Sequence, residues 1–62
     1  MFEWIEVGDG YRKFQDSEGN IVAEVYALAT PNVWRARVLD GMKDVDFHTE
    51  DEAKAHIERI FQ

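Results

Sequence analysis

Hydrophobic and polar residues alternate with a period of two along most of this chain, which is the pattern of β-strands that bury one face. Clusters of Gly, Asp, Asn and Pro interrupt the alternation at short intervals and mark the turns between strands. The pattern predicts strands over residues 2–7, 11–15, 21–28 and 33–39, and a short fifth strand over residues 42–47. Asp40-Gly41, before the fifth strand, is the strongest two-residue hairpin signal and favours a type I′ turn.

The period changes in the last segment, where apolar residues fall on one face of a helix. Ala53, Ile57, Ile60 and Phe61 are spaced i, i+4, i+7 and i+8. Thr49, followed three residues later by Glu52, fits a capping box, in which the hydroxyl and the carboxylate each satisfy a backbone N–H. We therefore expect a helix over residues 50–61.

Together these elements predict one α+β domain over residues 1–62. Its architecture is an antiparallel β-meander of four to five strands with one C-terminal α-helix packed on one face, in two layers. A chain of 62 residues has room for one core only. Below about 70–80 residues a core rarely supplies more than about 3–5 kcal/mol, and the chain has no cysteine for a disulfide. Aromatic packing or self-association is left to strengthen the fold.

Strand parity predicts which side chains face the helix. In the fourth strand Trp34, Ala36 and Val38 share a face, and Trp34 is the expected centre of the core. The other inward side chains are expected to be Phe14, Ile21, Ala23, Val25 and Ala27. Val22, Glu24 and Tyr26 then point outward, where Glu24 can pair with Arg35 or Arg37 across strands.

The first strand has two credible inward pairs, Phe2 with Trp4 and Ile5 with Val7. We prefer Ile5 and Val7 inside. This choice places aromatic residues beside two arginines on the open face, a combination enriched at protein–protein hot spots. The candidate binding residues of this aromatic face are Trp4, Tyr11, Tyr26, Arg35 and Arg37. Such a face can bind a partner, form a homodimer, or simply remain wet, because a one-helix sheet leaves one face uncovered.

The acidic balance is concentrated in one stretch. Residues 40–52 hold six carboxylates and one Lys, a formal charge of −5 out of the total of −6. The six are Asp40, Asp44, Asp46, Glu50, Asp51 and Glu52. Duplex DNA carries one negative charge per about 1.7 Å of axis, so a dense row of carboxylates can compete for a cationic DNA-binding groove. Alternatively, the same residues serve a turn, an edge strand and a helix start, and form ordinary solvated surface.

The residues that could act in catalysis or bind a metal do not form a recognisable catalytic pattern. His48, Glu52 and His56 are spaced by four, but His48 precedes the expected helix, and solvated histidines are the favoured interpretation. Ser17 is the one serine and lies in a turn, and no cysteine nucleophile exists. We therefore predict no enzyme activity, no cofactor and no metal site.

Charge and hydropathy also bear on partners and location. The acidic balance argues against nucleic acid and anionic lipid as direct ligands, because both need clustered Lys and Arg. No apolar segment approaches the roughly 20 residues of a membrane helix, and the N-terminus lacks the pattern of a secretion signal. We expect a cytoplasmic protein whose partner is a protein with a basic surface.

Four short segments form a framework that covers most of the chain: Trp4-Ile5-Glu6-Val7-Gly8, Val22-Ala23-Glu24-Val25-Tyr26, Trp34-Arg35-Ala36-Arg37-Val38 and Phe47-His48-Thr49-Glu50-Asp51-Glu52-Ala53-Lys54. This framework resembles short acidic orphan proteins of phages and mobile elements. Small acidic proteins of that origin include inhibitors of host defence of the anti-CRISPR and anti-restriction kinds, some of which resemble DNA in their charge distribution. The resemblance implies a non-enzymatic inhibitor that occupies a basic, nucleic-acid-binding surface of a defence complex in the host cytoplasm. The alternative is a small structural or homodimerisation module that acts through the aromatic face.

Overall fold

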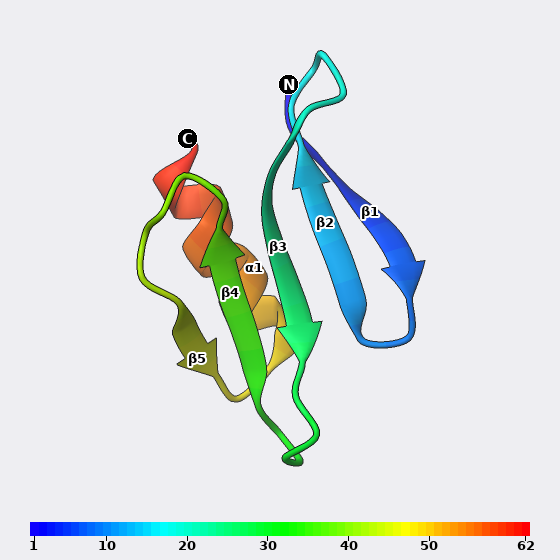
Figure 1. The fold of residues 1–62 in the computed structure, drawn as a ribbon, viewed down its shortest axis with the longest axis vertical. Helices are drawn as coiled ribbons and strands as arrows, with labels where there is room; N and C mark the ends of the chain where they lie inside the picture. Colours follow the sequence, from blue (N-terminus) through cyan, green and yellow to red (C-terminus); the bar gives the residue numbers. More distant parts are fainter.

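A computed structural model describes all residues 1–62 as two layers, an antiparallel sheet and a helix behind it (Figure 1). The strands lie in the sheet in chain order: β1 (Glu3–Gly8), β2 (Tyr11–Gln15), β3 (Ile21–Ala27), β4 (Trp34–Val38) and β5 (Val45–Phe47). The helix α1 (Glu50–Ile60) packs against β3, β4 and β5. The predicted α+β meander with one C-terminal helix is therefore confirmed.

The core lies between the helix and the middle of the sheet. Its seven buried residues are Phe14, Ala23, Val25, Ala36, Val38, Ala53 and Ile57. Ala23 and Val25 of β3 and Ala36 and Val38 of β4 belong to it, each pair separated by one residue as alternation across a strand requires, whereas Ala27, predicted to face inward, is exposed. Ile57 and Val25 are the largest fully buried side chains. Trp34 faces inward as predicted but packs at the margin of this cluster, so the expectation that it forms the centre is wrong.

The helix begins where its capping residue predicts. The Thr49 hydroxyl accepts a hydrogen bond from the Glu52 backbone N–H at 3.1 Å, while the Glu52 side chain makes no return bond to Thr49. Acidic residues occupy the first turn and Arg59 the last, and both placements favour the helix dipole. With 11 residues, α1 is neither long nor apolar enough to cross a membrane.

The side chains of β1 that face the helix are the opposite set from the one that we predicted. Trp4 is registered against the buried Phe14 of β2, and their ring centroids are 4.4 Å apart. Phe2 stacks on Phe14 at 5.3 Å and contacts Phe61 at 5.4 Å. Because the helix lies over β3–β5, large aromatic side chains fill the space beside it under β1 and β2. Phe2 and Trp4 therefore lie on the helix side, and alternation places Ile5 on the open face.

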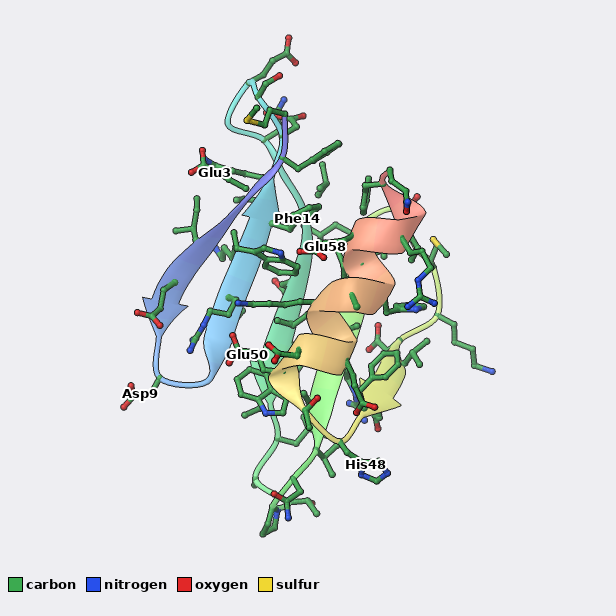
Figure 2. All side chains as sticks on the ribbon, turned by 180° about the vertical axis from the view of Figure 1, so that it is seen from behind. Glu3, Asp9, Phe14, His48, Glu50 and Glu58 are labelled. Atoms are coloured by element: carbon green, nitrogen blue, oxygen red, sulfur yellow. The ribbon has the colours of Figure 1, made fainter.

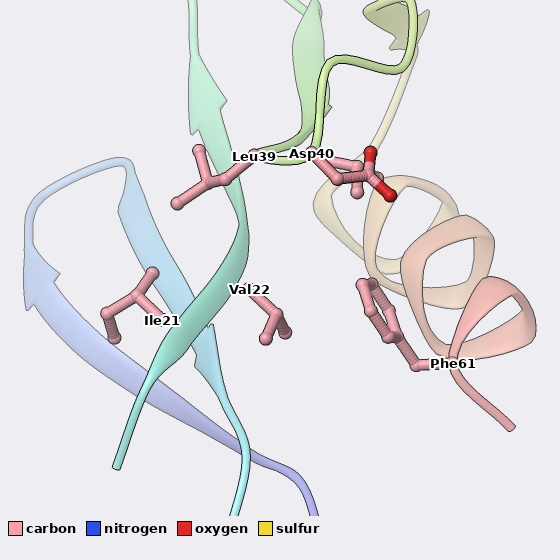
Figure 3. A pocket seen from close by; sticks show the side chains of 6 residues that line it. Ile21, Val22, Leu39, Asp40 and Phe61 are labelled. Carbon is pink, nitrogen blue, oxygen red and sulfur yellow. The ribbon is translucent and has the colours of Figure 1, made fainter.

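A register shift at the start of β3 reverses the predicted orientations of Ile21 and Val22. Phe14 pairs with Ala23 but Gln15 pairs with Ile21, so Val22 is the extra residue of a β-bulge. Val22 packs against the core and points toward Phe61, whereas Ile21 points away from it (Figure 3). The prediction that Ile21 faces inward and Val22 outward is therefore wrong, because strict alternation fails at a bulge.

The connection between β4 and β5 is longer than predicted. A type I′ turn needs positive φ at both central residues, but only Gly41 has it, at +99°. The strands are joined by the six residues 39–44, and β5 is reduced to three residues. The Asp40 carboxylate accepts the Met42 backbone N–H at 3.3 Å, which holds this open turn. The predicted tight hairpin at Asp40-Gly41 is not formed.

Candidate interaction surfaces

The acidic stretch is distributed over several parts of the fold. Asp40 lies in the connection after β4 and lines a pocket together with Phe61, the residue that follows the helix. Asp44 precedes β5 and Asp46 lies within it. The last three carboxylates form the first turn of α1: Glu50, Asp51 and Glu52. An 11-residue helix is about 16 Å long, so Asp40 is separated from the helix start by roughly that distance.

Asp46 is neutralised by a cation from the neighbouring strand. Arg35 of β4 lies directly opposite Asp46 and binds it with two hydrogen bonds, Nε to Oδ1 at 2.7 Å and Nη2 to Oδ2 at 3.1 Å. The bidentate pair lowers the pKa of Asp46 and raises that of Arg35. The alternative pairing of Arg35 with Glu24 is not formed.

Glu50 is also held by cations, on the other side of the sheet. Its Oε2 lies 2.8 Å from Lys54 Nζ, one turn along the helix, and 3.2 Å from Arg12 Nε of β2. Lys54 first and Arg12 second lower the pKa of Glu50. Figure 2 shows Glu50 and Glu58 projecting from the helix toward the β1–β2 hairpin. Glu50 therefore ties the helix start to the sheet.

Arg12 is the residue that our sequence reasoning missed. Only 15% of its side chain is exposed, and it forms a second ion pair with Glu6 at 3.2 Å. Nη1 donates to the backbone carbonyls of Gly8 at 2.8 Å and Tyr11 at 3.1 Å. Its guanidinium also lies 5.9 Å from the centre of the Trp34 ring. The signal was present, because alternation places residue 12 on the same face as the buried Phe14.

Four carboxylates of the stretch remain exposed and make no ion pair. They are Asp40, Asp44, Asp51 and Glu52. The structure thus reduces the predicted surface of six residues to four. Asp51 and Glu52 are consecutive residues in the first turn of the helix, at its positive end, whereas Asp44 directly precedes β5, the strand before the helix.

The open face of the sheet carries four of the five residues predicted for the aromatic face. Tyr11 and Tyr26 are cross-strand neighbours whose rings meet edge to face at 6.3 Å. Arg35 and Arg37 alternate with the buried residues of β4 and so lie on this same face. Trp4 lies on the helix side, where its Nε1 donates to Glu58 at 2.8 Å, and is therefore excluded from the face.

Tyr11 links the strands of the open face. Its hydroxyl donates to Glu24 Oε2 at 2.9 Å, which raises the pKa of Tyr11 because loss of the proton would place two negative charges together. Glu24 is registered against Arg37 but forms no ion pair with it. The predicted Glu24–arginine pair is replaced by the tyrosine contact.

A small apolar pocket of about 280 Å³ lies at one corner of the molecule (Figure 3). Five apolar side chains and one carboxylate line it: Ile21, Val22, Val38, Leu39, Phe61 and Asp40. The lining includes no histidine, serine or cationic side chain. No three His, Asp or Glu side chains anywhere in the chain are grouped as metal ligands.

Comparison with protein-family models, curated proteins and solved structures finds no match to this chain. Its function is therefore inferred from the geometry of its own residues.

Proposed function

We propose that this protein is a non-enzymatic protein-binding inhibitor, and that its unpaired carboxylates occupy a basic, nucleic-acid-binding surface of another protein. The observation that carries the proposal is the division among the carboxylates of residues 40–52. Asp46 and Glu50 are held by arginines of the protein itself, whereas the other four are exposed and have no cation: Asp40, Asp44, Asp51 and Glu52. Unpaired charge attracts a partner of the opposite sign over a distance of about a Debye length.

The placement of these carboxylates supports contact with a rigid partner. Asp51 and Glu52 stand on the first turn of a helix capped by Thr49, and Asp44 adjoins a strand that is paired with β4. Side chains on ordered elements lose less entropy on binding than side chains on free loops. The resemblance to phage and mobile-element proteins adds a target class, a host defence complex of the kind that anti-CRISPR or anti-restriction proteins inhibit.

Reversing two of these charges tests the proposal. The variant Asp44→Lys/Asp51→Lys changes the net charge by four, and its matched control, Asp9→Lys/Glu18→Lys, makes the same change at two exposed turn residues without an ion pair. Each protein is immobilised, incubated with bacterial lysate, and eluted with a salt gradient or with duplex DNA. Circular dichroism checks the fold, because a lysine in the first turn opposes the helix dipole. Asp44→Asn/Asp51→Asn is the milder variant if that check fails.

The wild type and the control should capture the same Lys- and Arg-rich protein, released by about 0.3 M salt and displaced by DNA. The Asp44/Asp51 variant should bind that purified protein at least about tenfold more weakly. Equal loss in both variants would mean that net charge rather than this site matters. Capture that DNA does not displace would contradict occupation of a nucleic-acid-binding surface.

A further inference from the structure

The helix-free face of the sheet has no partner within the chain. Figure 1 looks onto this face, with α1 behind it. We propose that it is a self-complementary surface on which a second copy of this chain packs, forming a symmetric dimer. The inference concerns the opposite side of the molecule from α1 and does not depend on the proposed function.

The charge of the face fits a second copy. Lys13, Arg35 and Arg37 are its cations. By alternation and register, the anions on the same face are Glu3, Glu24 and Asp46. The face is therefore neutral, while the whole chain has a formal charge of −6. Two copies would repel each other at any acidic surface, so the neutral face is where identical chains can meet.

The size of the face also fits. The molecule extends 34 × 23 × 18 Å, and the sheet lies perpendicular to the shortest dimension. The outline of the whole molecule in that plane, 34 by 23 Å, covers at most about 780 Å², so the open face can approach the ~800 Å² per partner of a standard interface. Its apolar area includes Ile5 and Leu39, the latter 48% exposed and pointing away from Phe61 (Figure 3). Two sheets packed in this way bury such side chains between them.

The small core supplies a reason for association. Three of its seven buried residues are alanines, and no disulfide or metal site strengthens the fold. Small domains of this kind often gain their missing apolar burial from a second subunit. Packing two open faces would turn a two-layer protein into a four-layer one with the sheets in the middle.

The register of β2 and β3 suggests how two copies would align. Lys13 lies beside Glu24, and Tyr11 lies beside Tyr26. A two-fold axis in the interface, parallel to the strands and between β2 and β3, would place Lys13 over the partner's Glu24. The same axis places Tyr11 over the partner's Tyr26. Because the axis is two-fold, each of these contacts occurs twice.

Complementary charge variants test both the dimer and its register. In Lys13→Glu alone, the new carboxylate would face the partner's Glu24, and in Glu24→Lys alone the new ammonium would face the partner's Lys13. Each variant should dimerise at least about tenfold more weakly than the wild type. An equimolar mixture of the two restores opposite charges at both contacts and should recover the dimer. Lys43→Glu, an exposed substitution in the β4–β5 connection with the same charge change as Lys13→Glu, is the control and should dimerise normally.

Sedimentation velocity from about 10 µM to about 1 mM measures the association, with circular dichroism as the check on folding. A wild type that remains monomeric to about 1 mM overturns the proposal, as does a mixture of folded variants that fails to recover the dimer. If a charge variant unfolds, Tyr26→Ser replaces it, because it removes aromatic contact area without adding charge. A dimer undisturbed by Tyr26→Ser would likewise place the interface elsewhere.

Discussion

The two faces of the sheet are built on different principles. On the helix side, aromatic rings and small buried residues pack together, and the one arginine there, Arg12, is bound to two carboxylates and two backbone carbonyls. On the open side, tyrosines and charged residues contact one another at the surface, as in the Arg35–Asp46 and Tyr11–Glu24 pairs. We therefore expect substitutions on the helix side to lower the stability of the fold more than substitutions on the open side.

The largest expected difference between the two faces is in the stability lost when an isoleucine on each is replaced by alanine. Ile57 is fully buried, and Ile57→Ala should lower the free energy of unfolding by about 3 kcal/mol through lost burial and a cavity. Ile5 is half-buried on the open face, and Ile5→Ala should cost about 1 kcal/mol or less. Urea unfolding at low protein concentration measures both, because dilution removes any contribution from association. Equal costs would show that the open face is also a core in the monomer.

The two sides also differ in the role of their arginines. Arg12→Met should destabilise the fold by about 1–2 kcal/mol, because Glu6 loses its cation and Glu50 loses one of two. Arg37 is exposed and makes no ion pair, so Arg37→Met should change stability by no more than about 0.5 kcal/mol. Thermal unfolding of the two variants measures the difference in stability between them. An unchanged melting temperature in Arg12→Met would mean that the buried contacts of Arg12 add no net stability.

The order and type of the elements could be read from the sequence because alternation, turn residues and the Thr49 cap act locally. The features that the sequence did not predict depend on how the elements pack against one another. The alternation along β1 is compatible with either Trp4 or Ile5 facing the helix side. Because the helix lies over β3–β5, a gap remains beside it under β1 and β2, and the larger Trp4 side chain fills that gap. The bulge at Val22 and the long connection after Val38 likewise depend on pairing between strands.

The acidic stretch shows the same limit for a candidate site. Its six carboxylates are conspicuous in the sequence, but their cations come from elsewhere: Arg12 lies in β2 and Arg35 in β4. Which carboxylates remain unpaired is therefore a property of the fold. The alternation of the strand could have placed Arg12 correctly, because residues 12 and 14 share a face. A charged residue, however, is not usually expected beside a core.

A smaller effect should appear when acid titrates the helix side. Lys54 and Arg12 lower the pKa of Glu50 below its ordinary value of 4.5. The unfolded chain thus binds a proton more readily than the folded one, so the contribution of Glu50 is complete above pH 4.5 and is lost as pH falls through its folded pKa. Glu50→Gln should cost about 1 kcal/mol or less at neutral pH and reduce the acid dependence of unfolding. Glu52→Gln, in the same turn but without an ion pair, is the matched control.

The smallest effect lies on the open face and is spectroscopic. Glu24 raises the pKa of Tyr11 by accepting a hydrogen bond from its hydroxyl, and Glu24→Gln should bring that pKa back toward 10.0. The stabilising effect of the bond is present below pH 10 and disappears as pH rises through the folded pKa of Tyr11. Tyr11→Phe should therefore cost about 0.5–1 kcal/mol at neutral pH, since the bond is only partly buried. Phenolate absorbance, with Tyr11→Phe to assign the signal, measures the titration. A Tyr11 curve that does not move in Glu24→Gln would mean that water already competes for this bond, and that the open face is less ordered than the helix side in this respect as well.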